Sequence, residues 1–254
     1  MEFLTAQNLD PPEDGFGLQQ AVLEEVAAGG RGPTALMWSS TPYVGATRPE
    51  TRLPGFGEAK RRSEAMGFPV LVRNSGGGAV AANEGCISFS LTLPVEDLRH
   101  GLYERYAEGV DLVSAALRRV GVEAEGGEVD GEFCPGAYSV RSGGPAGIKH
   151  AGLAQRVTRR AARVEALILV QKTAELVPVL EAFYGAIGLP FRPDSIADLT
   201  ADVLETIEAL ITEVQSRHAG GRGDIPASTL ERARALRASW RTAHGPSGPV
   251  SSDL

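Results

Sequence analysis

The chain has 254 residues, of which 43% are hydrophobic and 22% charged, an ordinary composition for a globular protein with a sizeable core. Its formal net charge of −7 argues against a general attraction to nucleic acid or anionic membranes. No apolar run approaches the roughly 18 residues of a membrane span, and the first residues resemble no signal peptide. Two cysteines are too few for a disulfide framework. We therefore expect a cytoplasmic protein, with neither nucleic acid nor membrane as partner.

The first third of the chain alternates helical and extended patterns. Apolar residues recur every four positions from Leu18 to Val26 and predict a helix, which Gly29-Gly30 would end. The next expected elements are a strand over residues 34–39, a loop rich in Pro, Gly and Arg over 41–57, a helix over 58–66 and a buried strand over 69–73.

The remainder begins with a strand pattern and becomes helical. Apolar residues alternate with Ser and Thr from Ile87 to Leu93, which predicts a half-buried strand. The later expected elements are a helix over 102–120, short elements in a Gly-rich stretch, a strand over 164–170, helices from Thr173 onward, a last helix opened by a capping box at 228–231, and a disordered tail over 245–254. We expect one α+β domain over 1–244 with a helical section over about 173–244.

Three consecutive glycines follow Ser75. Glycine runs carry a cost in backbone entropy, so a loop keeps them where it needs an unusual conformation or close approach by another group. The plain alternative is a tight connection between two strands. The segment lacks the Gly-Lys-Ser/Thr of a phosphate-binding loop and the spacing of a dinucleotide fingerprint.

Cys134 and Lys149 are the two candidate reactive residues. Cys134 lies in the turn-rich sequence DGEFCPG, whereas Cys86 lies at the start of the expected strand that Ile87 continues. A thiol becomes a nucleophile when a nearby cation favours its thiolate; the alternative is an ordinary turn residue. Lys149 lies among small and apolar residues in GIKHAGLAQR, and is either committed to a ligand or solvated. Gln155 is either a ligand contact or a buried polar group.

Arginines cluster at positions 156, 159, 160 and 163 of this acidic chain. They form either a solvated strand face with a turn or a local site for an acidic partner. The four histidines show no metal-ligand spacing, so we predict no metal site, and no G-x-S-x-G nucleophile elbow is present.

Three passages, in this order, resemble the biotin/lipoate protein ligase superfamily, most closely its lipoyl amidotransferase branch, the octanoyl-[glycine cleavage H protein]:protein octanoyltransferases. They are GATRPETRLP at 45–54, VRNSGGGAV at 72–80, and GEFCPGAY at 131–138 followed by 147–156. The likeness runs from about residue 17 to 240. The superfamily's ligases often carry His-Asp after the glycine loop, where this chain has Ala82-Asn83.

The resemblance implies an α/β (α+β) fold with a mixed β-sheet flanked by helices, and an acyl chain threaded under the glycine loop. Cys134 would form a thioester with an octanoyl or lipoyl group, and Lys149 would stabilise the carbonyl. The implied substrate-binding residues are Arg73, Ser75, Gly76, Gly77, Gly78, Ala79, Gly152 and Gln155, with Arg156, Arg159 and Arg160 for partner recognition.

The same resemblance implies the partners. The donor would be an acylated glycine cleavage H-like protein or an acyl carrier protein, and the acceptors would be lipoyl domains of 2-oxoacid dehydrogenase complexes. No cofactor would be required. One alternative is an ATP-dependent lipoate–protein ligase, which would not need Cys134. A second, from another functional class, is a non-catalytic protein that binds an acyl group or its carrier.

Overall fold

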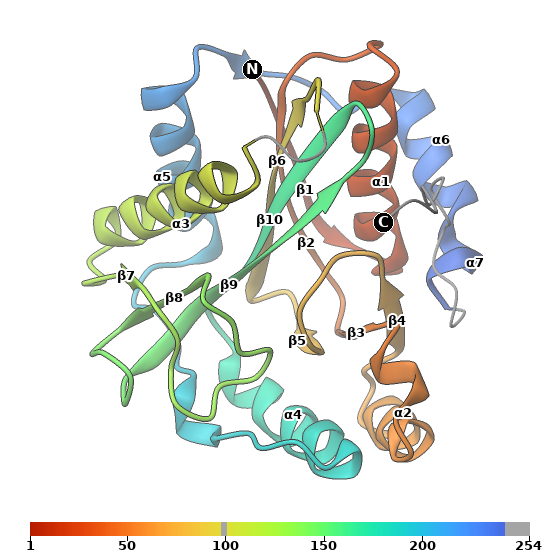
Figure 1. The fold of residues 1–254 in the computed structure, drawn as a ribbon, viewed down its shortest axis with the longest axis vertical. Coiled ribbons are helices and arrows are strands. Elements are labelled where there is room, and N and C mark those ends of the chain that lie inside the picture. Colours follow the sequence, from red (N-terminus) through yellow and green to blue (C-terminus); the bar gives the residue numbers. More distant parts are fainter. Residues whose placement is uncertain (98–100, 242–254) are drawn as a thin grey trace.

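An eight-stranded mixed sheet forms the centre of the computed structural model, which describes residues 1–97 and 101–241 (Figure 1). The strand order is β11-β1-β2-β6-β10-β9-β8-β7. Strand β1 runs parallel to β2 and β11, and the other neighbours are antiparallel. The strands are β1 (Glu2–Leu9), β2 (Thr34–Ser40), β6 (Cys86–Pro94), β7 (Glu125–Gly126), β8 (Ser139–Ser142), β9 (Ile148–Val157), β10 (Ala161–Leu169) and β11 (Gly221–Arg222).

A second, three-stranded sheet has the order β4-β3-β5. Its strands are β4 (Val70–Arg73), β3 (Tyr43–Thr47) and β5 (Val80–Ala82). The glycine-rich segment connects β4 to β5, as expected for a link between two strands. The predicted loop over 41–57 is therefore wrong in part, because it contains β3, a 3-10 turn at Glu50–Arg52 and the start of a helix at Phe56.

Helices cover both faces of the large sheet (Figure 1). Helix α1 packs on β2, β6 and β10, with α6 and α7 against its outer side. Helix α3 packs on β8, β9 and β10, and α5 packs on α3 and β6. Helices α2 and α4 pack on each other beside the small sheet. The helices are α1 (Glu13–Ala27), α2 (Phe56–Ala65), α3 (Leu102–Arg119), α4 (Thr173–Ile187), α5 (Val203–Arg217), α6 (Ala227–Ala235) and α7 (Arg237–Trp240). The expected mixed sheet flanked by helices is confirmed.

Strand β6 differs from its predicted half-buried state. Its apolar residues, such as Phe89, pack against α3 and α5, while Ser88, Ser90 and Thr92 point to the other face and are also buried. The reason is its place in the middle of the sheet, where α1 and the small sheet cover the polar face. A polar strand face inside a protein is compatible with a lined pocket, and Ser88 does line one.

The ends of two C-terminal helices also differ from expectation. Helix α6 begins at Ala227 after Pro226 and has no side-chain cap, so the capping box predicted at 228–231 is wrong. The observed capping box opens α5, where Asp202 and Glu205 bond each other's backbone. The predicted tail over 245–254 lies outside the described residues. Among the residues that are described, no helix has both the length and the apolar character needed to cross a bilayer.

Candidate active site

A pocket of about 320 Å³ lies between the two sheets. A row of register partners crosses the large sheet beneath it: Trp38 on β2, Ser88 on β6, Leu167 on β10 and Gly152 on β9. Neighbouring strands lie about 4.8 Å apart, so this row spans about 14 Å across three spacings. The pocket is therefore long and runs perpendicular to the strands, which suits an extended apolar chain.

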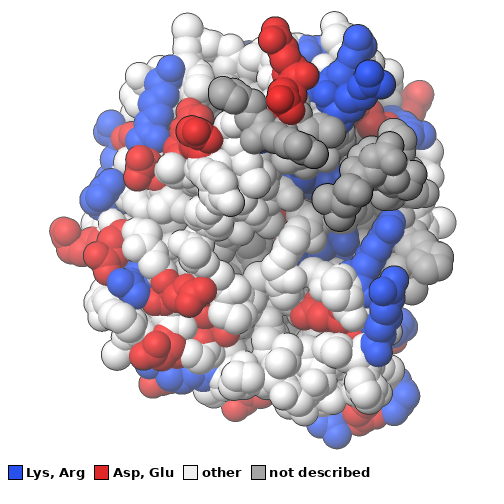
Figure 2. All heavy atoms as spheres, viewed as in Figure 1, with Lys and Arg blue, Asp and Glu red and all other residues white. Residues whose placement is uncertain are grey.

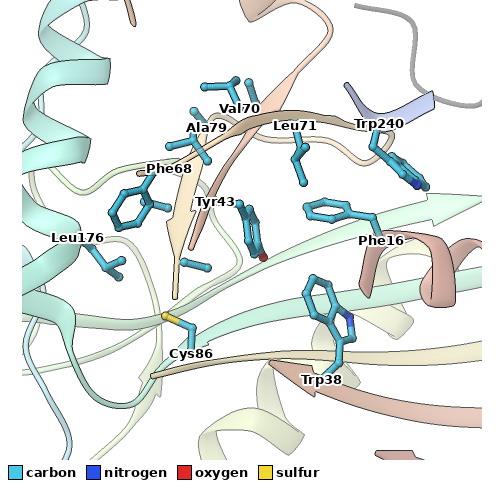
Figure 3. Close-up of a cluster of buried hydrophobic side chains, with 14 of the residues drawn as sticks. Phe16, Trp38, Tyr43, Phe68, Val70, Leu71, Ala79, Cys86, Leu176 and Trp240 are labelled. Atoms are coloured by element: carbon cyan, nitrogen blue, oxygen red, sulfur yellow. The ribbon is translucent and has the colours of Figure 1, made fainter. Parts of the chain in front are cut away.

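Aromatic side chains close the β2 end of the pocket. Trp38, Phe16 and Tyr43 line it and contact one another, and Trp240 of α7 packs against Phe16 from behind (Figure 3). Trp38 has no room to retreat, because a Cβ at Gly15 of α1 would lie 2.2 Å from its ring. Trp38 is therefore the end wall of the pocket.

Cys134 lies at the other end, in the turn before β8. Its φ of 45° is in the left-handed region, which residues with a side chain rarely adopt and which costs about 1–3 kcal/mol. The Sγ atom accepts a hydrogen bond from the Gly78 N–H at 3.1 Å, and Nη2 of Arg73 lies 3.8 Å away. An N–H dipole and a guanidinium thus both face the sulfur, a setting that suits negative charge there.

The glycine loop makes this approach possible. Gly77 has a φ of 95°, and a Cβ there would lie 2.8 Å from Cys134 Sγ and 3.0 Å from Arg73 Nη2. Gly76, in contrast, has open space around its Cα. Both Gly76 and Gly77 line the pocket. Close approach to the cysteine, rather than the turn alone, therefore explains the glycine at position 77.

Arg73 is held in place by the loop and by the partly buried carboxylate of Glu165. It donates to Ser75 Oγ at 2.9 Å and to the Gly78 carbonyl at 2.6 Å, and lies 4.0 Å from Glu165. Burial opposes ionisation of Glu165, but the charges of Arg163 and Arg73 and a hydrogen bond from Ser75 outweigh it and lower the pKa of this carboxyl. Glu165 is therefore a carboxylate at neutral pH and offsets part of the charge of Arg73 and Arg163.

Lys149 is fully buried and lines the pocket. Its Nζ donates to the carbonyls of Phe133 (2.8 Å) and Cys134 (3.1 Å) and pairs with Glu132 at 3.1 Å. All three ammonium protons thus have partners in the nucleophile's own turn. The solvated alternative is excluded. To reach a substrate carbonyl, Lys149 would have to exchange one of these partners.

Ala79 and Gln155 have different surroundings from those expected of ligand contacts. Ala79 is fully buried. Its N–H donates to the Glu50 carboxylate, and its carbonyl accepts from the Tyr184 hydroxyl. Gln155 faces α3, where its Oε1 accepts from Arg105 and its Nε2 donates to the Leu102 carbonyl. Its side chain lies outside the pocket lining, which favours the buried polar alternative.

The arginine cluster separates into two parts. Arg156 and Arg163 turn inward and donate to Asn74 beside the glycine loop. Arg159 and Arg160 are exposed at the turn between β9 and β10. On the face shown in Figure 2, basic and acidic side chains are interspersed rather than gathered in one broad patch of a single sign. Partner recognition by Arg159 and Arg160 stays a prediction.

Four residues that hold the site were not predicted from the sequence: Glu50, Glu132, Glu165 and Tyr184. Glu50 lies inside the passage at 45–54 and Glu132 two residues before Cys134, so the motifs contained them without marking their roles. Tyr184 belongs to no motif, and only its position on α4 brings its hydroxyl to the cysteine turn.

Replacing Lys149 with Met is expected to reduce both stability and acyl loading. It would leave Glu132 as a buried carboxylate without its cation, at a cost of about 3–5 kcal/mol in the free energy of unfolding. Adding Glu132→Gln should recover much of that stability. If the ammonium also stabilises the substrate carbonyl, loading of Cys134 falls on the order of 10²–10³-fold in both variants. Normal loading in the stable double variant would limit Lys149 to a structural role.

Comparison of structures first defines the class of fold. The chain superposes on the putative lipoate protein ligase Ta0514 of T. acidophilum, solved with lipoic acid, with a TM-score of 0.72 and 17% identity over 92% of this chain and 93% of that one. It superposes on a lipoate-protein ligase A solved with ATP with a TM-score of 0.73 and 18% identity, over 94% and 95% of the two chains. The fold is that of the lipoate protein ligases.

Sequence comparison then places the chain within a family. Residues 11–215 match the lipoyl protein ligase A/B catalytic domain, and the chain belongs to that family. It is 30% identical to the octanoyl-[GcvH]:protein N-octanoyltransferase of Geobacillus kaustophilus, over 78% of this chain and 69% of the relative. The similarly named protein of Bacillus velezensis is 28% identical, over 79% and 75%. These findings confirm the predicted branch of the superfamily, whose curated members are transferases.

Proposed function

We propose that the protein transfers an octanoyl group from a glycine cleavage H-type protein to a lysine of a lipoyl domain, through a thioester on Cys134. One observation carries this proposal. The Cys134 sulfur lies at one end of a long pocket between the sheets, held by the Gly78 N–H and faced by Arg73. A nucleophile at the end of an acyl-sized pocket is the arrangement that thioester formation requires.

The first step loads the enzyme. The Cys134 thiolate attacks the carbonyl carbon of the donor's octanoyl-lysine amide, so that a C–S bond forms and the C–N bond breaks. The donor lysine leaves as an amine after taking up a proton. The groups that face the sulfur, the Gly78 N–H and the Arg73 guanidinium, would stabilise the negative charge that develops on the carbonyl oxygen in this step.

The second step unloads it. The amine of the acceptor lysine attacks the thioester, a C–N bond forms, the C–S bond breaks, and the thiolate returns as the amine proton passes to solvent. One lysine amide is exchanged for another, so the overall reaction is close to isoenergetic and needs neither ATP nor a metal. The acceptors we propose are lipoyl domains of 2-oxoacid dehydrogenase complexes; an acyl carrier protein is the alternative donor.

The contacts of the Cys134 sulfur favour transfer over ATP-dependent ligation. Arg73, whose guanidinium faces the sulfur, is held there by Ser75, the Gly78 carbonyl and Glu165. A cation and a backbone N–H fixed against a thiol suit a thiolate nucleophile. Neither a ligase nor a non-catalytic binding protein would need Cys134.

The test uses octanoylated glycine cleavage H protein and an apo lipoyl domain, incubated with the enzyme with and without ATP and analysed by intact mass. We expect the octanoyl group to reach the lipoyl domain equally well without ATP, with a hydroxylamine-labile octanoyl adduct on the enzyme. Modification that occurs only with ATP and free octanoate would identify a ligase instead.

Replacing Trp38 with Leu is expected to lengthen the acyl chain that the enzyme accepts. Because Trp38 is the end wall, a smaller side chain opens room for about two more methylenes, each contributing about 0.8 kcal/mol when buried. The ratio of decanoyl to octanoyl loading should therefore rise about tenfold relative to wild type. Trp240→Leu is the matched control, since Trp240 packs behind Phe16 and does not line the pocket. An unchanged ratio in Trp38→Leu would place the acyl chain elsewhere.

A further inference from the structure

The two halves of the site come from distant parts of the chain, and one hydroxyl group joins them. The Cys134 N–H donates to Tyr184 Oη at 2.6 Å, and the Tyr184 hydroxyl donates to the Ala79 carbonyl at 2.8 Å. Tyr184 lies on α4, outside the pocket lining, and its hydroxyl bonds backbone groups rather than the sulfur atom. A single side chain thus links the backbone of the nucleophile's turn to the backbone of the glycine loop.

The loop is held at the same residue from the other side. The Ala79 N–H donates to Glu50 Oε1 at 2.7 Å, and Glu50 Oε2 accepts from both the N–H and the hydroxyl of Thr47 at 2.8 Å. Ala79 directly follows Gly78, whose N–H bonds the Cys134 sulfur. Glu50 and Tyr184 therefore fix the peptide groups on both sides of Ala79 and anchor the chain directly after the residue whose N–H bonds the sulfur.

We propose that Tyr184 is a positioning residue of the acyl-transfer reaction, which together with Glu50 sets the placement of the Cys134 sulfur against the Gly78 N–H. This inference rests on the proposed thioester function. Tyr184 acts through the backbone of Cys134 and Ala79 and does not touch the substrate.

The hydroxyl, rather than the ring, has this role. The Tyr184 ring packs against Phe183 and Phe191, and phenylalanine would fill that space equally well. A buried hydroxyl is unfavourable unless it is hydrogen-bonded, and here it makes two bonds to backbone groups. Burial also raises the pKa of Tyr184 far above its usual value, so the hydroxyl keeps the proton that it donates to Ala79.

The contact with the Tyr184 hydroxyl helps to maintain the unusual backbone conformation of Cys134. Its left-handed backbone, with φ at 45°, persists only if surrounding contacts impose it. The Tyr184 hydroxyl bonds the N–H of this very residue, and Lys149 bonds its carbonyl. Without the hydroxyl, the Cys134 backbone can relax toward a common conformation and move Sγ away from the Gly78 N–H.

The first test is Tyr184→Phe, measured as single-turnover loading of the full-length enzyme from octanoylated glycine cleavage H protein. We expect the maximal loading rate to fall about 10- to 100-fold, the scale of a misplacement of about 1 Å. The donor concentration for half-maximal rate should not change, because Tyr184 does not line the pocket. Thr206→Val is the matched control: it removes a buried hydroxyl that donates to the Asp202 carbonyl on α5, and should load at the wild-type rate.

The second test is a double-mutant cycle with Glu50→Gln. Because Tyr184 and Glu50 hold the two sides of one residue, the double variant should load only slightly more slowly than the slower single variant. The proposal would be overturned if the two single variants' fold-losses in loading rate multiplied in the double variant. It would also be overturned if Tyr184→Phe loaded at the wild-type rate, or reached that rate at higher donor concentration. If Tyr184→Phe does not fold, Glu50→Gln alone tests the proposal: slower loading supports it, and loading at the wild-type rate overturns it. A wild-type enzyme that forms no thioester would refute the proposed function rather than this inference.

Discussion

Cys134→Ser will carry no octanoyl group after incubation with octanoylated glycine cleavage H protein, whereas the wild type will carry one that hydroxylamine removes. An alkoxide is much harder to generate near neutral pH than a thiolate, so the serine cannot replace the cysteine in the covalent step. Transfer to a lipoyl domain should fall on the order of 10³-fold or more, as when nucleophiles are removed from other acyl-transfer enzymes. Intact mass of both proteins measures the two effects together.

Cys86→Ala is the control for this experiment. Cys86 is buried at the start of β6, and burial raises the pKa of its thiol to about 12, so it stays protonated at neutral pH. This variant should form the adduct and transfer normally. The proposal would be contradicted by a Cys134→Ser enzyme that still modifies a lipoyl domain when supplied with ATP and free octanoate, since Cys134 would then be a bystander.

Gly77→Val will block acyl loading by at least about 10²-fold, the effect expected when reacting groups are displaced by about an ångström. A side chain at this position has to displace the Cys134 sulfur or the Arg73 guanidinium, and the φ of 95° is itself strained for valine. Both groups belong to the site, so the sulfur or the guanidinium must move out of position even if the fold is kept. Loading and melting temperature should be measured on the same preparation.

Gly32→Ala provides the comparison, because its added Cβ meets nothing within 4 Å and its backbone is not in the left-handed region. It should load at the wild-type rate. If Gly77→Val also loads normally while folded, the glycine at 77 serves the turn alone, and the close approach to Cys134 is not needed for chemistry.

Local patterns in the sequence were sufficient for much of the fold. The period-four repeat from Leu18 to Val26 corresponds to α1, and the alternation from Ile87 to Leu93 corresponds to β6. Such patterns succeed because helix and strand geometry are set by neighbouring residues. The burial of both faces of β6 was not predictable in this way, since it depends on which elements cover the sheet.

The reactive residues were also recognisable, because their chemistry stands out from their surroundings. Three glycines in a row, a cysteine before Pro-Gly and a lysine among small residues are each uncommon, and their order along the chain resembled one family. The structure brings all three together, with the Gly78 N–H on the sulfur and the Lys149 ammonium on the Cys134 carbonyl.

Only the tertiary structure decided which ordinary residues hold that site. Tyr184 is 50 positions from Cys134 and 105 from Ala79, and nothing local distinguishes it from other helical tyrosines. The commitment of Lys149 to Glu132, and of Gln155 to α3, likewise follows from packing. The physical reason is that composition and spacing determine backbone conformation and chemical type, while the partner of a buried polar group is determined by whichever segment folds against it.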